Sequence, residues 1–94
     1  MANGDVVFFG TAAIGLPIAR ELHKGWRLSL VVTQPDRRGG RNRQLLVPAV
    51  KQFAQENRLP LLQPPDLREP ELELAMRRIE PDIAVVVAYG QFIP

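Results

Sequence analysis

Apolar and polar residues follow two different periods along this chain, and their order predicts alternating strands and helices. Short apolar runs occupy 5–9, 28–32, 59–62 and 82–89, and all of them except 59–62 contain β-branched residues. Such runs are typical of buried strands. Between them, apolar residues recur at spacings of three and four, which is typical of amphipathic helices. The resulting order of four strands and three helices predicts parallel strands joined by right-handed crossovers.

Each predicted helix has an apolar face that we expect to lie against the sheet. Pro17 is expected in the first turn of the first helix, and Gly25 as its left-handed C-terminal cap. In the third helix, which begins at Pro70 and ends before Pro81, Glu73 and Arg77 are spaced to form an ion pair. The expected faces are Ile14, Ile18 and Leu22 in the first helix; Leu46, Val50, Phe53 and Ala54 in the second, with Pro48 near its start and Asn57 near its end; and Leu72, Met76 and Ile79 in the third.

We therefore predict an α/β fold, a Rossmann-like three-layer parallel sheet with strand order 3-2-1-4. The run 82–89 is the most continuously apolar, which predicts a strand covered on both faces. Ligands of such sheets bind beyond the carboxyl ends of the strands, near the point where the strand order reverses. The loops after strands 1, 2 and 4 are therefore the candidate site.

Composition narrows the class of protein. Ninety-four residues form at most one domain, and no apolar run approaches the roughly 18 residues that span a membrane. The N-terminus has no secretory signal, so we expect a cytoplasmic protein. The chain has no cysteine and one histidine, His23. A disulfide framework, a thiolate zinc site, a cysteine nucleophile and a multi-histidine metal site are excluded, and no metal is expected.

Basic charge is concentrated in one predicted loop, T-Q-P-D-R-R-G-G-R-N-R, from Thr33 to Arg43. It holds four of the twelve Lys and Arg residues, namely Arg37, Arg38, Arg41 and Arg43. Arginine binds phosphate oxygens bidentately, so the loop suits a polyanionic partner. A solvated connection between two elements explains the same composition, and the pattern alone does not separate the two interpretations.

Two further segments follow predicted strands. Gly10 and Gly15 have the spacing of a phosphate-binding loop, but Leu16 and Pro17 stand where that motif needs Lys and Ser or Thr. The free N–H groups of a helix start can still bind a polar ligand group. The segment from Tyr89 to Pro94 places an aromatic ring, a glycine and an amide after strand 4, which suits the edge of a flat heterocycle; alternatively, it begins another core element.

The remaining titratable residues have structural explanations. His23 lies in the last turn of a helix, where a positive charge is favourable. Glu69, Glu71 and Glu73 cluster at a helix start, which the helix dipole favours. Asp36 and Asp82 flank strand ends, where a functional role is open, and Asp36 alternatively orders the loop that follows it.

The motifs together resemble those of the methionyl-tRNA formyltransferases. They are V-F-F-G-T, V-V-T-Q-P-D-R-x-G-G-R, V-P-A-V-K, P-L-L-Q-P and V-V-V-A-Y-G-Q-F-I-P, and they extend from Val6 to Pro94. The resemblance implies the N-terminal half of a formyltransferase domain. It also implies transfer of a formyl group from 10-formyltetrahydrofolate to the amino group of initiator methionyl-tRNA, by a protein that we expect to be monomeric and cytoplasmic, or in an organelle matrix if a transit peptide is removed.

The resemblance assigns roles to the three loops. The arginine loop is expected to contact the tRNA acceptor stem through Arg37, Arg38, Arg41 and Arg43. Folate is expected at Tyr89, Gly90, Gln91, Phe92 and Ile93, and the substrate cleft at Gly10, Thr11 and Ile14. Ala12-Ala13 and Arg38 depart from the usual pattern of a Pro-acid pair and a proline, which leaves the fit of the methionyl group near Ile14 open.

The family's Asn-x-His motif and later catalytic Asp are absent from these 94 residues. We expect the chain to be the portion of the domain that precedes these groups, and to be inactive alone. Two alternatives stay open: another 10-formyltetrahydrofolate-dependent formyltransferase or hydrolase, and a standalone nucleic-acid-binding module.

Overall fold

The computed structural model describes residues 4–39 and 44–90, and it has an α/β architecture. A four-stranded sheet, three α-helices and a separate two-stranded ribbon make up this part of the chain. In chain order the elements are β1 (Asp5–Gly10), a 3-10 turn η1 (Ala13–Gly15), α1 (Leu16–Gly25), β2 (Arg27–Val32), β3 (Arg37–Gly39), β4 (Gln44–Leu46), α2 (Ala49–Glu56), β5 (Leu61–Leu62), α3 (Pro70–Ile79) and β6 (Ile83–Val87).

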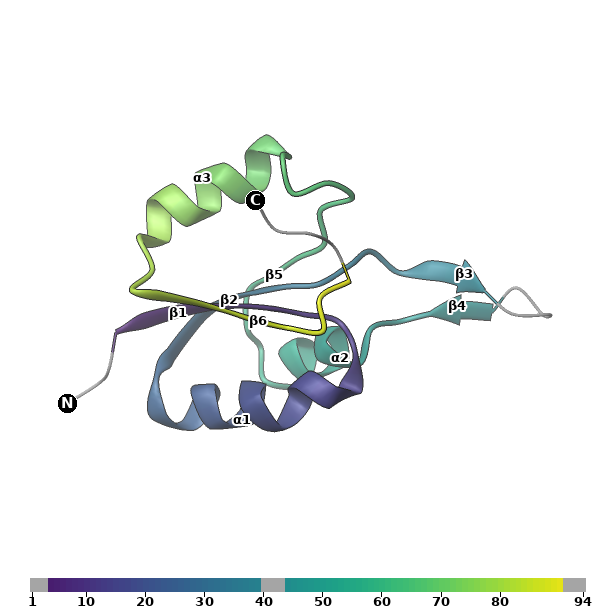
Figure 1. Cartoon of the computed structure of the whole chain (residues 1–94), viewed down its shortest axis with the longest axis horizontal. Coiled ribbons are helices and arrows are strands. Elements are labelled where there is room, and N and C mark those ends of the chain that lie inside the picture. The colour runs from purple at the N-terminus through teal and green to yellow at the C-terminus, as the bar shows by residue number, and fades with distance from the viewer. Residues whose placement is uncertain (1–3, 40–43, 91–94) are drawn as a thin grey trace.

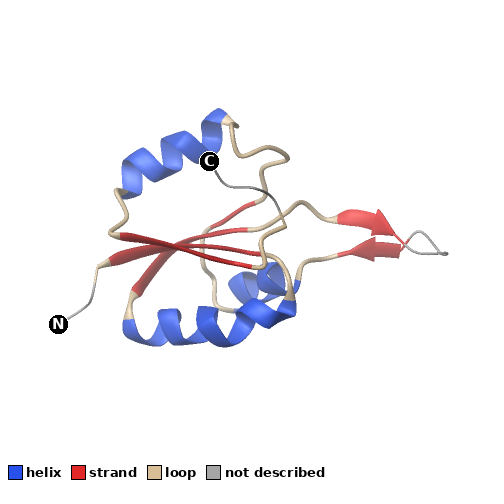
Figure 2. Ribbon diagram, viewed as in Figure 1, coloured by secondary structure: helices blue, strands red, loops and turns tan. Residues whose placement is uncertain are grey.

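The main sheet has the predicted strand order. Its strands run β5-β2-β1-β6 and every neighbouring pair is parallel, which is the order 3-2-1-4 when the ribbon strands are left out. Figure 1 shows α1 and α2 on one face of the sheet and α3 on the other, so that the sheet is the middle of three layers. Figure 2 separates these layers by colour. The Rossmann-like fold is thus confirmed.

The central strand β1 supplies the core on both faces, because successive side chains of a strand point to opposite sides. Val6 and Phe8 pack in the cluster under α1 and α2, while Val7 and Phe9 pack in the cluster under α3. All four are buried. The predicted face of α3 is also confirmed, since Leu72 is buried and Met76 and Ile79 pack against the same cluster.

The predicted face of the first helix is wrong for Ile14 and Ile18 and right for Leu22. Ile14 is 74% exposed and Ile18 is also exposed, whereas Ala19 is buried and Leu22 packs on the core. The phase differs because Ile14 belongs to the 3-10 turn, so the α-helix starts two residues later, with Pro17 in its first turn as predicted.

The predicted left-handed cap at Gly25 is wrong as well. Gly25 is the last helical residue, and the helix is capped by Trp26 in an extended conformation. The Trp26 N–H donates to the Leu22 carbonyl at 2.9 Å.

The arginine segment is not a simple loop, and Leu46 is not helical. Residues 37–39 and 44–46 form an antiparallel β-hairpin that projects from the body of the molecule, and α2 begins only at Ala49. Leu46 is exposed in β4. The hairpin was missed because no sheet lies beneath it, so burial does not impose the period-two apolar pattern that marks other strands.

The prediction that the last strand is covered on both faces is also wrong for the described residues. Among them β6 has one neighbour, β1, and Ile83 and Val86 are exposed. No helix in residues 4–39 and 44–90 is long and apolar enough to cross a membrane.

Candidate functional site

The loops that follow β1, β2 and β6 meet at the carboxyl edge of the sheet. Thr11, in the first of these loops, forms hydrogen bonds to the other two. Its hydroxyl donates to the Tyr89 carbonyl at 2.7 Å and accepts from the Gln34 N–H at 3.1 Å. Its own N–H donates to the Ala88 carbonyl at 3.2 Å. One side chain thus joins three segments that are far apart in the sequence, at the edge where parallel sheets bind ligands.

A cleft of about 740 Å³ lies among these loops and the base of the hairpin. This volume is within the range of pockets that bind small molecules. The lining residues come from all three loops, from the hairpin and from the start of α2; they are Thr11, Ala12, Gln34, Pro35, Asp36, Arg37, Leu46, Val47, Pro48, Ala49, Pro65, Ala88, Tyr89 and Gly90.

The chain after β6 enters this cleft through two left-handed residues. Gly90 has φ 100°, a conformation that strongly favours glycine, while Ala88 has φ 50° despite its Cβ. The Ala88 carbonyl is held there by the N–H of Thr11. Strained backbone of this kind often marks functional segments, and nothing in the sequence around Ala88 indicates it.

Tyr89 points away from solvent. It is buried in the core cluster under α3, and its ring meets that of Phe9 edge-on with centroids 5.7 Å apart. Burial raises the pKa of the Tyr89 hydroxyl above its ordinary value of 10.0. The hydroxyl has no hydrogen-bond partner among the described residues. Within this part of the chain Tyr89 therefore supports the cleft wall from behind.

The hairpin brings one of the predicted arginines to the cleft. Arg37 lines it and is exposed. The backbone of Arg38 pairs with that of Leu45 in the ribbon. The predicted residues Arg41 and Arg43 lie outside the described residues.

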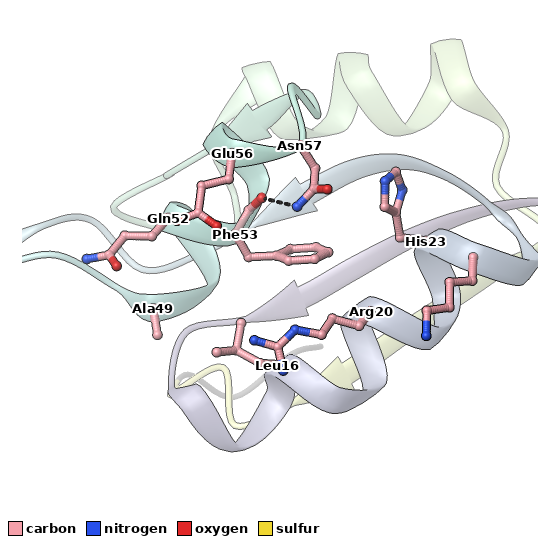
Figure 3. Close-up of a pocket in the computed structure, with 9 residues that line it drawn as sticks. Leu16, Arg20, His23, Ala49, Gln52, Phe53, Glu56 and Asn57 are labelled. Carbon is pink, nitrogen blue, oxygen red and sulfur yellow. Dashed lines mark hydrogen bonds between the residues drawn. The ribbon is translucent and has the colours of Figure 1, made fainter.

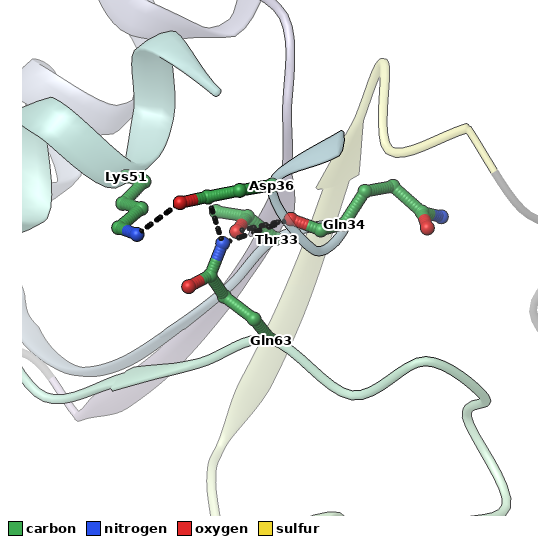
Figure 4. Close-up of polar contacts among 5 residues, drawn as sticks. All are labelled: Thr33, Gln34, Asp36, Lys51 and Gln63. Carbon is green, nitrogen blue, oxygen red and sulfur yellow. Dashed lines mark hydrogen bonds and ion pairs between the residues drawn. The ribbon is translucent and has the colours of Figure 1, made fainter. Parts of the chain in front are cut away.

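The root of the hairpin is held by a polar cluster that sequence reasoning largely missed (Figure 4). Lys51 Nζ donates to Asp36 Oδ2 at 2.7 Å, and Gln63 Nε2 donates to Asp36 Oδ1 at 2.8 Å. The Lys51 and Asp36 side chains are only 17% and 21% exposed. These hydrogen bonds hold the pKa of Asp36 below its usual 3.8. Asp36 is thus bound by side chains of α2 and of the segment after β5, and no local pattern in the sequence indicates these contacts.

The other predicted site residues occupy different positions around the cleft. Gly10 ends β1, and a Cβ there would overlap the Phe8 ring and come within 3.0 Å of the Val87 carbonyl. Ile14 is not among the residues that line the cleft. Gln91, Phe92 and Ile93, predicted to bind folate with Tyr89 and Gly90, lie outside the described residues. Asp82 accepts the N–H of Asp5 at 2.8 Å, at the opposite edge of the sheet.

A second hollow, of about 440 Å³, lies between α1 and α2 (Figure 3). His23, Arg20 and Lys24 from α1 face Phe53 and Glu56 from α2. The His23 ring meets that of Phe53 edge-on, with centroids 6.1 Å apart, which agrees with a structural role. Residues 4–39 and 44–90 contain no group of three or more His, Cys, Asp or Glu side chains placed to hold a metal ion.

Comparison with known proteins identifies the family of this chain. The model of the family described as Formyl transferase matches residues 5–94, which is nearly the whole chain. The chain belongs to the formyl transferase family.

Three similar proteins from different bacteria are all methionyl-tRNA formyltransferases. The chain is 45% identical over 95 residues to a methionyl-tRNA formyltransferase of Geobacter sulfurreducens, with 100% of this chain and 30% of that protein covered. It is 46% identical over 88 residues to one of Akkermansia muciniphila, with 94% and 28% covered, and 43% identical over 91 residues to one of Geobacillus thermodenitrificans, with 96% and 28% covered. The chain therefore spans about 30% of the length of the first of these curated relatives.

Membership of the formyl transferase family confirms the predicted resemblance and is consistent with the Rossmann-like sheet. It does not assign roles to individual residues. The cleft, the hairpin and the segment around Gly90 are the features from which those roles can be argued.

Proposed function

We propose that this chain is the N-terminal portion of a methionyl-tRNA formyltransferase, in which 10-formyltetrahydrofolate donates a formyl group to the amino group of methionyl-tRNA. The observation that carries the proposal is an identity of 40–46% to methionyl-tRNA formyltransferases along almost the whole chain. The arrangement of an arginine hairpin beside a cleft supports it, because this reaction needs an RNA and a small donor held next to each other.

The hairpin is the proposed contact for the tRNA acceptor stem. Arg37, Arg38, Arg41 and Arg43 supply positive charge, and bidentate contacts to phosphates fix the position of an RNA without reading its bases. The projection of the hairpin from the body supports this role, since a ribbon can reach along a stem that the body itself does not cover. The exposed Arg37 lies where the hairpin meets the cleft.

The cleft is the proposed site of the folate donor, with Tyr89, Gly90, Gln91, Phe92 and Ile93 as its binding segment. Among the described residues the fit is favourable. Gly90 lines the cleft with φ 100°, a conformation that residues with a Cβ rarely adopt, so no side chain covers the backbone there. Gly90 is exposed, so its backbone N–H and C=O can meet the polar edge of a pterin.

We also propose that residues outside these 94 complete the reacting centre. Transfer of a formyl group requires a base for the attacking amine and donors for the tetrahedral oxyanion. His23, the single histidine, lies in the α1–α2 hollow and does not line the cleft. The part of the domain described here would therefore recognise and orient the substrates. We place the protein in the cytoplasm, or in an organelle matrix after removal of a transit peptide, and expect a monomer.

A chimera tests the proposal. This chain replaces the matching segment of the Geobacter sulfurreducens relative, and formyl transfer to methionyl-tRNA is measured with 10-formyltetrahydrofolate. We expect transfer by the chimera and none by the 94-residue chain alone. A folded chimera that formylates only small amines would refute the tRNA role and favour another formyl transferase. Transfer by the chain alone would refute the proposed division of the site.

The arginines are tested in the same chimera. Arg41→Ala should raise the KM for methionyl-tRNA and lower the salt slope of RNA binding by about one. Arg78→Ala, on the exposed face of α3, is the matched control and should change neither. An unchanged slope with Arg41→Ala would argue against a phosphate contact at that position.

A further inference from the structure

The direction of the hairpin is decided at its root, where the chain leaves the sheet after β2. Asp36 is the last residue before β3, so any rotation at Asp36 is carried along the whole ribbon. The ribbon projects from the body in Figure 1. An angular change at the root therefore displaces the far ends of β3 and β4 more than their bases, since a strand extends by about 3.3 Å per residue.

The Asp36 carboxylate is held at both oxygens by two different parts of the fold. Lys51 of α2 binds Oδ2 at 2.7 Å, and Gln63, after β5, binds Oδ1 at 2.8 Å. The same Gln63 amide also donates to the Gln34 carbonyl at 3.1 Å. Figure 4 shows these side chains converging on the segment between β2 and β3.

We propose that Lys51, Asp36 and Gln63 are positioning residues that fix the hairpin relative to the cleft. The inference rests on the proposed function for its consequence, which is that the hairpin arginines present RNA at a fixed distance from the formyl donor. Lys51 and Gln63 do not line the cleft, whereas Asp36 lines it at the base of the hairpin.

The Lys51–Asp36 pair differs from the other described ion pairs in its surroundings. Arg77 and Glu73 approach equally closely, at 2.8 Å, but their side chains are 77% and 63% exposed. Exposed pairs are screened by water and contribute little. The Lys51–Asp36 pair is largely shielded, and the second hydrogen bond from Gln63 leaves the carboxylate little freedom to rotate.

Spin-label distances test the positioning directly, and the absence of cysteine from the chain makes specific labelling straightforward. Labels at Leu45→Cys and Lys24→Cys report the hairpin against α1, and labels at Leu45→Cys and Glu71→Cys report it against α3. Labels at Lys24→Cys and Glu71→Cys report the body alone. All three sites are exposed.

Lys51→Met and Asp36→Asn should each broaden or shift both hairpin distances and leave the body distance unchanged. Lys51→Arg should preserve most of the wild-type distribution, and Glu73→Gln, which breaks the exposed pair on α3, should preserve all of it. Gln63→Leu keeps the ion pair and removes only the amide. It serves as a second test if Lys51→Met or Asp36→Asn also changes the body distance, which would mean that the substitution disturbs the whole fold. Hairpin distances that stay unchanged in these variants would overturn the proposal, as would a wild-type distribution already as broad as theirs.

Kinetics of the chimera supply a second readout. Lys51→Met should lower kcat about tenfold or more while KM for methionyl-tRNA changes little, because the arginines still bind RNA but hold it in the wrong place. Arg37→Ala should instead raise KM. An unchanged kcat in a variant with broadened distances would overturn the proposal. Failure of the wild-type chimera to transfer formyl groups would refute the proposed function, while the distances would still decide the positioning.

Discussion

Thr11→Val removes one hydroxyl from the point where three loops meet, and it should destabilise the fold without changing its shape. Valine has nearly the volume of threonine. The substitution therefore deletes the bond to the Tyr89 carbonyl at 2.7 Å and the bond from the Gln34 N–H at 3.1 Å, and it leaves both backbone groups without this partner.

The expected loss follows from those two bonds. Each net hydrogen bond contributes about 1 kcal/mol, and a buried group left unsatisfied costs about 1–3 kcal/mol. Both bonds are only partly buried, so water can replace part of what is lost. We therefore expect about 2 kcal/mol, which corresponds to a fall in Tm of about 8–16 °C for a domain of this size.

Urea unfolding measures the loss, with the fluorescence of Trp26 as the probe. Trp26 is the single tryptophan and packs against the core under α1 and α2. With an m-value of about 1–2 kcal/mol/M, the midpoint should fall by about 1–2 M and m should not change. Thr11→Ser keeps the hydroxyl and is the matched control, with an expected loss below about 1 kcal/mol. Equal losses of unfolding free energy in the two variants, or a loss below about 0.5 kcal/mol for Thr11→Val, would refute the conclusion that the Thr11 hydroxyl holds the loops together.

Four further predictions concern the same edge of the sheet. Tyr89→Phe should leave stability unchanged or raise it by up to about 1 kcal/mol, because it removes a buried hydroxyl that has no partner among the described residues; a loss above about 1 kcal/mol in urea unfolding would show that the hydroxyl is bound. The pKa of Tyr89 is raised in the folded chain, so its contribution to stability is complete below pH 10 and is lost as pH rises through the folded value; tyrosinate absorbance of this single tyrosine should appear at higher pH in the folded than in the urea-unfolded chain. The pKa of Asp36 is lowered in the folded chain, first by Lys51 and then by Gln63, so its contribution is present above pH 3.8 and is lost as pH falls through the folded value; Asp36→Asn should flatten the acid limb of a stability profile measured by Trp26 fluorescence, and an unaltered acid limb would contradict this. Ala88→Gly should relieve the left-handed strain at φ 50° and change stability by no more than about 1 kcal/mol, in the favourable direction, whereas Ala88→Val should destabilise clearly; the reverse order of the two variants in urea unfolding would contradict the strain.

The sequence predicted the sheet well because the sheet obeys rules that act over short stretches. The four apolar runs, the three helical periods and the rule of right-handed crossovers were sufficient to predict the strand order β5-β2-β1-β6. The acidic start of α3 and its Glu73–Arg77 pair also depend on residues close in sequence. Such features need no knowledge of the tertiary structure.

The errors arose where neighbours distant in sequence decide the outcome. Ile14 and Ile18 have helical spacing, but the 3-10 turn before Leu16 changes which side of α1 meets the sheet. The hairpin carries no burial pattern, and Leu46 was therefore assigned to the next helix.

Some residues of the candidate site could be predicted from the sequence, and others could not. Thr11, Arg37 and Gly90 follow strand ends and could be placed at the cleft from the order of elements alone. Lys51 and Gln63 could not, because they reach Asp36 across 15 and 27 residues. Their roles depend on how α2 and the segment after β5 pack on the sheet. Only the folded chain brings these side chains together.

The central position of β1 affects the order in which parts of this structure can fold. β1 is central, yet one of its two partners, β6, is the last element of the described chain, and the bond between Thr11 and Tyr89 joins residues 78 apart. Closing a loop of that length is entropically costly and slow compared with forming local contacts. During synthesis on the ribosome, the hairpin and α2 can therefore form well before the cleft, which is completed only after residue 90 has left the exit tunnel.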